Sequence, residues 1–452
     1  MRIDLEIPLR LEECISAMNG RGAIQDVTIR TLVTDSREAI CGDLFIALAK
    51  EKKDRIAYVK EARSFGAITV SEEYADLSVT DTEEALLSLA SLYRSRLTRL
   101  VSVVGITGSV GKTTVKEFIA CLLSESYRVH ATPGNYNNAI GLSISMLTAP
   151  ADTEVLVLEM GMNHSGEIRR LNEHACVDIG VITSVGTAHI GELGSRENIA
   201  RAKRELLEHG AKAIIPYGEP LLSGIIGATT FSERDEGADV YFSKMKNIGG
   251  GYNVNIEQKG YRSISANLNV TGRQNAANLL PAIAVCRELN LMDSDIARRI
   301  SSISNVNIRQ NIEKCSKFFI LEDSYNASAE SMLPAFEQLY EEIGFGERCA
   351  LLGDILELGS AGESIHFRLG YEIGARKPRS LFLCGDYAVH YAEGALSAAL
   401  EKDRIHIFAP KDAEECATCV LSDMREGELL LAKGSHKSAI PRVLRFLKER
   451  GR

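Results

Sequence analysis

Residues 101–114 read VSVVGITGSVGKTT and combine the patterns of a strand, a glycine-spaced turn and the start of a helix. Residues 101–104 are rich in β-branched side chains, as in a buried strand of a parallel sheet. The turn has glycines at 105, 108 and 111, and its backbone N–H groups and the following helix N-terminus suit phosphate. Because Lys112 can add a positive charge and Thr113 a hydroxyl ligand for Mg²⁺, the stretch predicts a nucleotide site, although Ile106 replaces a glycine of the strict phosphate-loop pattern.

The length and composition of the chain limit the number of domains and the kind of protein that it can be. With 452 residues it is too long for one hydrophobic core, and about two to four domains are expected. A hydrophobic fraction of 45% and a charged fraction of 25% are typical of a soluble globular protein. The formal net charge of −9, without a block of basic residues, argues against nucleic acid as a partner.

Targeting and cysteine patterns indicate a cytoplasmic protein. The first ten residues, MRIDLEIPLR, lack the apolar core of a signal peptide, and no stretch has the apolar length of a membrane span. The ten cysteines are scattered, which suits a reducing compartment. Cys416 and Cys419 share a C-x-x-C spacing, but no second Cys/His pair lies nearby, so we interpret them as ordinary helix positions.

The order of strand and helix patterns predicts an α/β protein. Strands are expected at 101–104, 154–159, 178–182 and 212–215 with helical segments between them, which indicates a parallel sheet. Residues 228–270 alternate in the manner of antiparallel strands. From about residue 313 short apolar runs and helical segments alternate again, which predicts a second, smaller doubly wound domain. Residues 1–98 precede the nucleotide strand and hold a strand–turn–strand pattern around Asp35-Ser36-Arg37.

Polar side chains follow the predicted central strands, at the sheet edge where ligands bind in open α/β folds. Glu159 ends the run EVLVLEM and can reach a metal beside Thr113, although an acid at a strand end is as often structural. His189 follows the next strand, and a neutral imidazole there could hold a second metal. Lys203 lies in RENIARAKRELLEHG, and by itself it is interpreted as a solvated helix lysine.

Together these motifs resemble those of the Mur ligase family, in the family's order and along nearly the whole chain. GITGSVGKTT is similar to its ATP loop, NYNNAIGL to its asparagine motif and EMGMNHSGEI to its glutamate motif. ITSVGTAHI and AKRE are similar to its metal-histidine and lysine motifs, and GRQNAANLL to its adenine-site motif. LEDSYNASAESM, LLGDILELG and AKGSHK resemble third-domain motifs, and TDSREAICGDLFIAL the segment that holds the uridine end of the substrate.

The resemblance implies three domains. It implies a small α/β domain at 1–98 for the UDP-linked substrate, a central P-loop parallel-sheet ATPase domain at 99–312 and a C-terminal Rossmann-like domain at 313–452. The implied activity is an ATP-dependent amide ligase of peptidoglycan synthesis. ATP would phosphorylate a peptide carboxylate, and an amine would attack the acyl phosphate. Such chemistry depends mainly on positioning the substrates and neutralising charge. A site built from metal ligands and cations, with no covalent nucleophile, is suited to it.

The branch of the family that the motifs resemble joins D-alanyl-D-alanine to UDP-N-acetylmuramoyl-tripeptide, so both are expected as small-molecule partners of a monomer, with ATP and Mg²⁺ as cofactors. The resemblance gives catalytic roles to Lys112, Glu159, His189 and Lys203. It places ATP on Gly108, Ser109, Val110, Gly111, Lys112, Thr113, Thr114, Asn275, Asn278, Arg309 and Asp323. Metal would be held by Thr113, Glu159, His189 and Lys203, and substrate by Ser36, Arg37, Asn138 and Lys433.

Lys203 matches the lysine that this family carbamylates with CO₂. An unmodified lysine, with a pKa near ~10.4, is a cation and a poor neighbour for a metal. The carbamate is an anion that can face Mg²⁺, so the modification reverses the sign of the charge. We therefore expect a carbamylated Lys203 beside the second metal.

Several positions depart from the family pattern, and none is an expected metal ligand. Gln274 replaces a histidine of the adenine motif, and His436 an arginine after Lys433-Gly434-Ser435; three further third-domain changes are Glu322, Ser328 and Ala329. In the first domain Asp54-Arg55-Ile56 replaces the usual Asp-Gly-His, and Arg55 is expected to bind diphosphate or a carboxylate of the substrate.

Two alternatives have to be weighed against this interpretation. A paralogous ATP-dependent amide ligase with a different acid or amine stays open. A nucleotide-binding regulatory protein without ligation is disfavoured, because Lys112, Glu159, His189 and Lys203 are all retained. The sequence also leaves open whether the third residue of the acceptor peptide is lysine or diaminopimelate.

Overall fold

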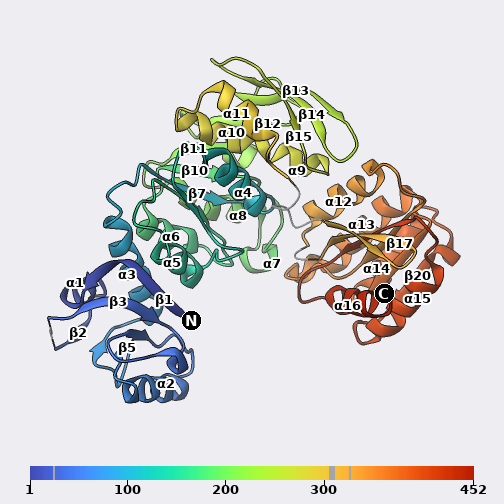
Figure 1. The fold of residues 1–452 in the computed structure, drawn as a ribbon. Helices are drawn as coiled ribbons and strands as arrows, with labels where there is room; N and C mark the ends of the chain where they lie inside the picture. The colour runs from blue at the N-terminus through green and yellow to red at the C-terminus, as the bar shows by residue number, and fades with distance from the viewer. Residues whose placement is uncertain (24–25, 305–310, 325–326, 452) are drawn as a thin grey trace.

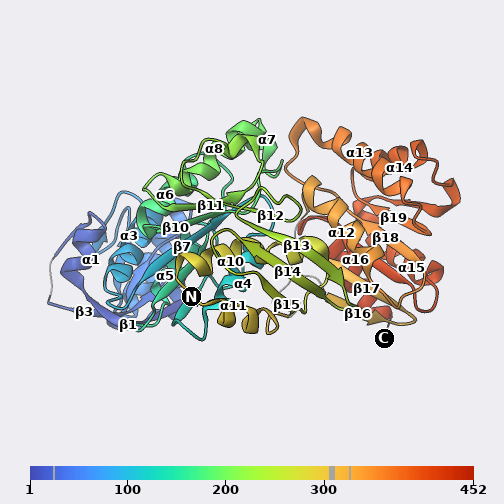
Figure 2. The ribbon, with the colours of Figure 1, turned by 90° about the horizontal axis from the view of Figure 1, so that it is seen from above.

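Three sheets follow one another along the chain. The computed structural model describes residues 1–23, 26–304, 311–324 and 327–451, apart from the side chain of Asn311. The first and third sheets lie at opposite ends of the molecule with the second between them, as both views show (Figure 1 and Figure 2). Within these ranges every helix is too short or too polar to cross a lipid bilayer.

The first sheet is mixed, with strand order β1-β3-β4-β5-β6-β2. Its inner strands are parallel, while β1 and β2 pair antiparallel at the two edges. The strands are β1 (Arg2–Arg10), β2 (Arg21–Gly22), β3 (Thr28–Val33), β4 (Leu44–Ile46), β5 (Ile68–Ser71) and β6 (Leu77–Ser78). The helices are α1 (Leu11–Ala17), α2 (Lys52–Ser64) and α3 (Thr82–Ser95).

Helix α3 connects the first sheet to the second. Asp81 caps its start by accepting a hydrogen bond from the Glu84 N–H at 2.8 Å, and Glu83 and Glu84 favour the positive end of the helix dipole. The helix packs on α5 (Ala139–Leu147), and the buried Tyr93 hydroxyl donates to the Ala149 carbonyl at 2.8 Å. Apolar side chains from both sheets share one core cluster, so the first sheet is packed firmly on the second.

The second sheet is parallel over most of its width, with strand order β15-β14-β13-β12-β11-β10-β7-β9-β8. The four expected parallel strands are confirmed as β7 (Ser102–Thr107), β9 (Val155–Glu159), β10 (Ile179–Ile182) and β11 (Lys212–Pro216). The expected antiparallel strands are β13 (Val240–Asn247), β14 (Tyr252–Gln258) and β15 (Ile264–Leu268). Two further strands, β8 (Val129–Ala131) and β12 (Thr229–Ser232), are short and only partly buried. Their sequences therefore lack the hydrophobic pattern from which a strand can be predicted.

Helices cover both faces of the second sheet. On one face α4, α10 and α11 pack on a core cluster separate from the one shared with the first sheet. The helices of this region are α4 (Lys112–Leu123), α5, α6 (Glu167–Ala175), α7 (Ile190–Leu193), α8 (Arg196–Arg204), α9 (Arg273–Ala277), α10 (Leu279–Glu288) and α11 (Asp293–Ile300).

The third sheet is the predicted doubly wound unit, with strand order β16-β17-β21-β18-β19-β20. All its strands are parallel except β16, an antiparallel edge strand that the sequence patterns did not predict. The strands are β16 (Asn311–Cys315), β17 (Phe318–Asp323), β18 (Arg348–Leu352), β19 (Ser380–Cys384), β20 (Ile405–Phe408) and β21 (Leu429–Lys433). The helices are α12 (Ala329–Glu341), α13 (Gly362–Ala375), α14 (Ala388–Ser397), α15 (Ala413–Asp423) and α16 (Ile440–Arg450). Cys416 and Cys419 are helix positions on α15, as expected.

Candidate active site

The turn between β7 and α4 needs its glycines. Gly108 has φ +153°, and a Cβ atom there would lie 1.8 Å from the Thr183 hydroxyl. Gly111 has φ +86°, and a Cβ atom there would lie 2.5 Å from Asn278 Oδ1. The turn is therefore pressed between the loop after β10 and the start of α10. Helix α4 begins at Lys112, so the first N–H groups of that helix, which have no partner within the helix, lie at the open side of the turn.

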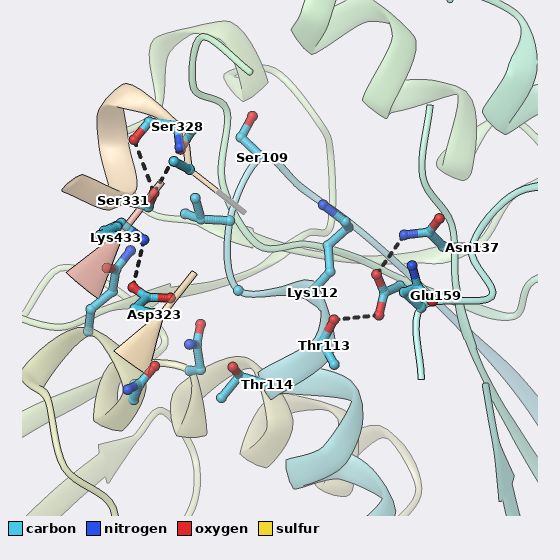
Figure 3. Close-up of a pocket in the computed structure, with 17 residues that line it drawn as sticks. Ser109, Lys112, Thr113, Thr114, Asn137, Glu159, Asp323, Ser328, Ser331 and Lys433 are labelled. Atoms are coloured by element: carbon cyan, nitrogen blue, oxygen red, sulfur yellow. Dashed lines mark hydrogen bonds and ion pairs between the residues drawn. The ribbon is translucent and has the colours of Figure 1, made fainter. Parts of the chain in front are cut away.

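Strand register helps to bring together Thr113 and Glu159, the two predicted ligands of the first metal. Ile106 of β7 lies beside Glu159 at the end of β9. The Thr113 hydroxyl donates to Glu159 Oε2 at 2.8 Å, and Asn137 Nδ2 donates to Glu159 Oε1 at 2.9 Å (Figure 3). Lys112 Nζ donates to the Gly108 carbonyl at 2.7 Å. A hydroxyl and a buried carboxylate are hard oxygen ligands, so this pair fits Mg²⁺.

These residues line an open cavity of about 200 Å³, here called the phosphate-loop cavity. Asp323 and Lys433 lie on its other side, at the ends of neighbouring strands β17 and β21, and Figure 3 shows them across the cavity from Lys112. Lys433 Nζ is buried and lies 2.6 Å from Asp323 Oδ2. The remaining predicted ATP residues in the lining are Ser109, Val110, Gly111, Thr114, Asn275 and Asn278. Arg309, also predicted to contact ATP, lies outside the described residues.

A second cavity of about 380 Å³ contains Lys203, and we call it the lysine cavity. It shares Lys112 and Asn137 with the phosphate-loop cavity, and it is also lined by His189 and Gly108. Lys203 is only 2% exposed, so its interpretation as a solvated helix lysine is wrong. Within the part of the chain that the structure describes, its amine has no hydrogen bond or ion pair. Burial, reinforced by the nearby Lys112 charge, lowers the pKa of Lys203 well below its usual value.

A third cavity of about 330 Å³, the junction cavity, lies where the second and third sheets meet. His189 lines both this cavity and the lysine cavity. Its Nδ1 lies 2.8 Å from a carboxylate oxygen of Glu357, and the Gly191 N–H donates to the Glu357 carbonyl at 3.2 Å. Burial lowers the pKa of His189, while Glu357 opposes this and the charges of Lys112 and Lys203 add to it. Ser435, His436 and Lys437 complete the polar part of the wall.

The predicted substrate residues are spread over the molecule. Asn138 lines the lysine cavity, but its Oδ1 caps α5 by accepting from the Gly141 N–H at 2.9 Å. Its neighbour Asn137, which the motif did not single out, is the one that contacts Glu159. Ser36 and Arg37 lie in the first sheet region, outside the three cavities. Ser36 donates to Glu61, and the largely exposed Arg37 pairs with Asp35.

The expected role of Arg55 is not supported by its contacts. Its guanidinium donates to the carbonyls of Ala49 and Lys50 at 3.1 and 2.9 Å, and it lies 2.8 Å from Glu72. These three contacts hold the loop before α2 against the strand β5 region. The arginine that replaces a family glycine therefore lies in the first turn of α2, where its guanidinium contacts the preceding loop and Glu72.

Two acidic residues of the third region were missed by sequence reasoning. Glu357 lies within the quoted LLGDILELG motif, but nothing in that motif shows that it reaches His189. Glu330, at the start of α12, accepts a hydrogen bond from the Thr187 N–H, and its charge also acts on Lys203. Both carboxylates come from a part of the chain more than 140 residues after the residues they contact, so only the folded chain could show these pairings.

Comparison with known proteins identifies the family. The Mur ligase middle domain family matches residues 106–286. A UDP-N-acetylmuramoyl-tripeptide–D-alanyl-D-alanine ligase of Bacillus subtilis is 34% identical over 455 residues, 97% of each chain. A solved UDP-N-acetylmuramoylalanyl-D-glutamyl-2,6-diaminopimelate–D-alanyl-D-alanyl ligase from Acinetobacter baumannii is 26% identical, with a TM-score of 0.84 and 99% and 100% of the two chains covered.

A third relative bears on nucleotide binding. The MurF ligase from Thermotoga maritima, solved in complex with ADP, is 27% identical with a TM-score of 0.79, and 92% of this chain and 97% of that chain are covered. Family match, full-length identity and shared architecture agree with the motifs around the phosphate-loop cavity. The chain belongs to the Mur ligase family, within the group of UDP-N-acetylmuramoyl-tripeptide–D-alanyl-D-alanine ligases.

Proposed function

We propose that this protein uses ATP to join D-alanyl-D-alanine to the peptide carboxylate of UDP-N-acetylmuramoyl-tripeptide, a step of peptidoglycan precursor synthesis. The observation that carries the proposal is the meeting of three cavities around Lys112, Asn137 and His189. One reaction that needs a nucleotide, an acid and an amine at a single point is amide synthesis through an acyl phosphate. The full-length similarity to ligases of this name supports the same assignment.

ATP is assigned to the phosphate-loop cavity. The N-terminal N–H groups of α4 and the Lys112 ammonium would bind its phosphates, while Asn275 and Asn278 lie where the adenosine end would be held. Thr113 and Glu159 would hold the first Mg²⁺, which supplies charge neutralisation for the transferred phosphoryl group when bound. Asp323 and Lys433 reach the same cavity from the third sheet, so both sheets contribute to nucleotide binding.

The acceptor carboxylate is assigned to the lysine cavity and the incoming amine to the junction cavity. Lys112 lines both the phosphate-loop cavity and the lysine cavity, so a carboxylate beside it can reach a bound γ-phosphate. The carboxylate oxygen attacks that phosphorus and ADP leaves. The dipeptide amine then attacks the acyl carbon, loses a proton, and phosphate leaves. His189 lines the lysine and junction cavities, which suits a residue at the point of amide formation.

We further propose that Lys203 acts as its carbamate. Its lowered pKa favours the neutral amine, which is the form that can attack CO₂. The nitrogen bonds to the carbon of CO₂ and gives up one proton to water, so the side chain gains a charge of −1. The buried carbamate would then face the Lys112 ammonium, and it could hold a second Mg²⁺ together with His189.

The chain organisation expected from the sequence is retained as part of the proposal. We propose domain boundaries at 1–98, 99–312 and 313–452, because the first two intervals contain the first two sheets and the last contains the third sheet apart from the first two residues of β16. We also propose that the protein works as a monomer in the cytoplasm. All ten cysteines are free in the described part of the chain, which suits a reducing compartment.

Phosphate release should require both substrates. Without an amine the acyl phosphate has no group to attack it, and the sequence motifs supply cations and expected metal ligands for phosphoryl transfer. We expect release near the background rate with ATP alone or with either single substrate. With both substrates present the rate should rise by about two orders of magnitude or more. A coupled phosphate assay measures this, and rapid ATP hydrolysis by the protein alone would contradict the proposed function.

A further inference from the structure

An ion-pair cluster forms part of the wall of the lysine cavity. Arg170 on α6 donates through Nη1 to Glu83 Oε1 at 2.8 Å and through Nε to Glu84 Oε2 at 2.7 Å. Both glutamates lie in the first turn of α3, so the cluster joins the first sheet region to the second. Glu83 and Arg170 line the cavity, whereas Glu84 does not. All three side chains are half exposed.

This pair presents two opposite charges to one ligand. Among the described residues Arg170 Nη2 and Glu83 Oε2 make no hydrogen bond, so this pair keeps one donor and one acceptor for a ligand. A group with an ammonium and a carboxylate on the same carbon matches that arrangement. The Arg170 guanidinium and a carboxylate form a charge-assisted hydrogen bond, and the ammonium does the same with Glu83.

The rest of the wall suits an aliphatic chain. Met162 and Leu171 are buried apolar residues in the lining of the same cavity. Lys112, Lys203 and His189, which would receive the reacting carboxylate, also line it. The cavity thus combines a cationic centre, apolar wall residues and a paired acid and base, which together match a methylene chain with a charged group at each end.

We propose that Glu83 and Arg170 bind the zwitterionic end of a diaminopimelate side chain at the third position of the acceptor peptide. This inference rests on the proposed function, because the reacting carboxylate and that side chain belong to the same residue and must share one cavity. A lysine side chain has the ammonium for Glu83 but no carboxylate for Arg170. The pair therefore makes the protein selective for diaminopimelate over lysine.

The test compares kcat/KM for two UDP-N-acetylmuramoyl-tripeptides that differ only in lysine or diaminopimelate at the third position. The parent protein should prefer diaminopimelate by at least about tenfold, the value of one charge-assisted contact. Arg170→Met should remove most of this preference by lowering kcat/KM for the diaminopimelate acceptor alone. Glu83→Gln should lower kcat/KM for both acceptors, while Arg170→Lys should restore part of the preference.

Glu84→Gln is the matched control, because it breaks the other half of the same cluster without changing the cavity wall. It should leave the ratio between the acceptors unchanged. Equal use of both acceptors by the parent protein, or an equal change of the ratio in Glu84→Gln and Arg170→Met, would overturn the inference while ligation itself stands. An absence of ligation with either acceptor would instead contradict the proposed function on which the inference rests.

Discussion

Lys203→Ala is expected to lower the ligation rate by about 100- to 1,000-fold, the usual effect of losing a buried charged group aimed at the reacting centre. The lysine is almost completely buried beside Lys112 in the lysine cavity. Removing the lysine deletes the proposed carbamate and, with it, the negative charge that would hold the second Mg²⁺. ATP binding should change little, because Lys203 does not line the phosphate-loop cavity. Steady-state ligation and nucleotide titration measure the two effects separately.

Three further experiments separate a catalytic role of Lys203 from a structural one. Arg204→Ala removes an exposed cation from the end of the same helix, and it should retain normal turnover. Acetate or another short carboxylic acid should restore part of the activity of Lys203→Ala by supplying the missing anion. With ¹³C-labelled CO₂ the parent protein should give a carbamate resonance that Lys203→Ala lacks. Near-normal turnover by Lys203→Ala would remove the proposed role of this residue.

Glu159→Gln should weaken Mg²⁺-dependent nucleotide binding and lower ligation by about 100-fold or more. The carboxylate is buried and accepts hydrogen bonds from Thr113 and Asn137. Glutamine keeps the size of the side chain but loses the charge and one of the two accepting oxygens, so the hard-ligand pair with Thr113 is impaired. Mg²⁺ titrations of activity and of ADP binding should both shift to higher metal concentration.

Glu154→Gln provides the control for this substitution, because Glu154 lies just before the opposite end of β9 and outside the three cavities. It should retain the parent's Mg²⁺ dependence. Thermal melting of both variants checks that the strand is intact. An unchanged Mg²⁺ requirement in Glu159→Gln would show that this carboxylate is not a metal ligand.

The phosphate-loop half of the site could be predicted because its geometry is local. A strand, a turn with glycines at fixed spacing and a helix that starts at Lys112 are encoded within residues 101–114. The position of Glu159 at the end of a neighbouring parallel strand follows from the same hydrophobic runs, since the carboxyl ends of parallel strands share one edge. The asparagine motif did not distinguish Asn137 from Asn138, because only the folded chain shows that Asn138 caps α5 while Asn137 contacts Glu159.

Other features depended on packing between distant segments. The sequence pattern of α8 did not predict the burial of Lys203. Arg55 was expected at a ligand, but its guanidinium contacts the loop before α2 and Glu72, beyond the end of β5. The short edge strand β16 was missed because such strands are held by their neighbours instead of by a pattern of their own. Periodicity shows that a residue belongs to a helix or strand, but it does not show which other element covers that residue.

The sequence by itself therefore determined the parallel strands of the second and third sheets, the phosphate loop and the family, because these depend on near-neighbour patterns and motifs in a fixed order. Only the tertiary structure decided what completes the site around them. Asp323 and Lys433 reach the nucleotide cavity from the third sheet, Glu357 approaches His189, and Arg170 pairs with Glu83 across the first and second sheet regions. Such contacts join residues tens to hundreds of positions apart, and their distances are set by how the three sheets pack on one another, which no local pattern encodes.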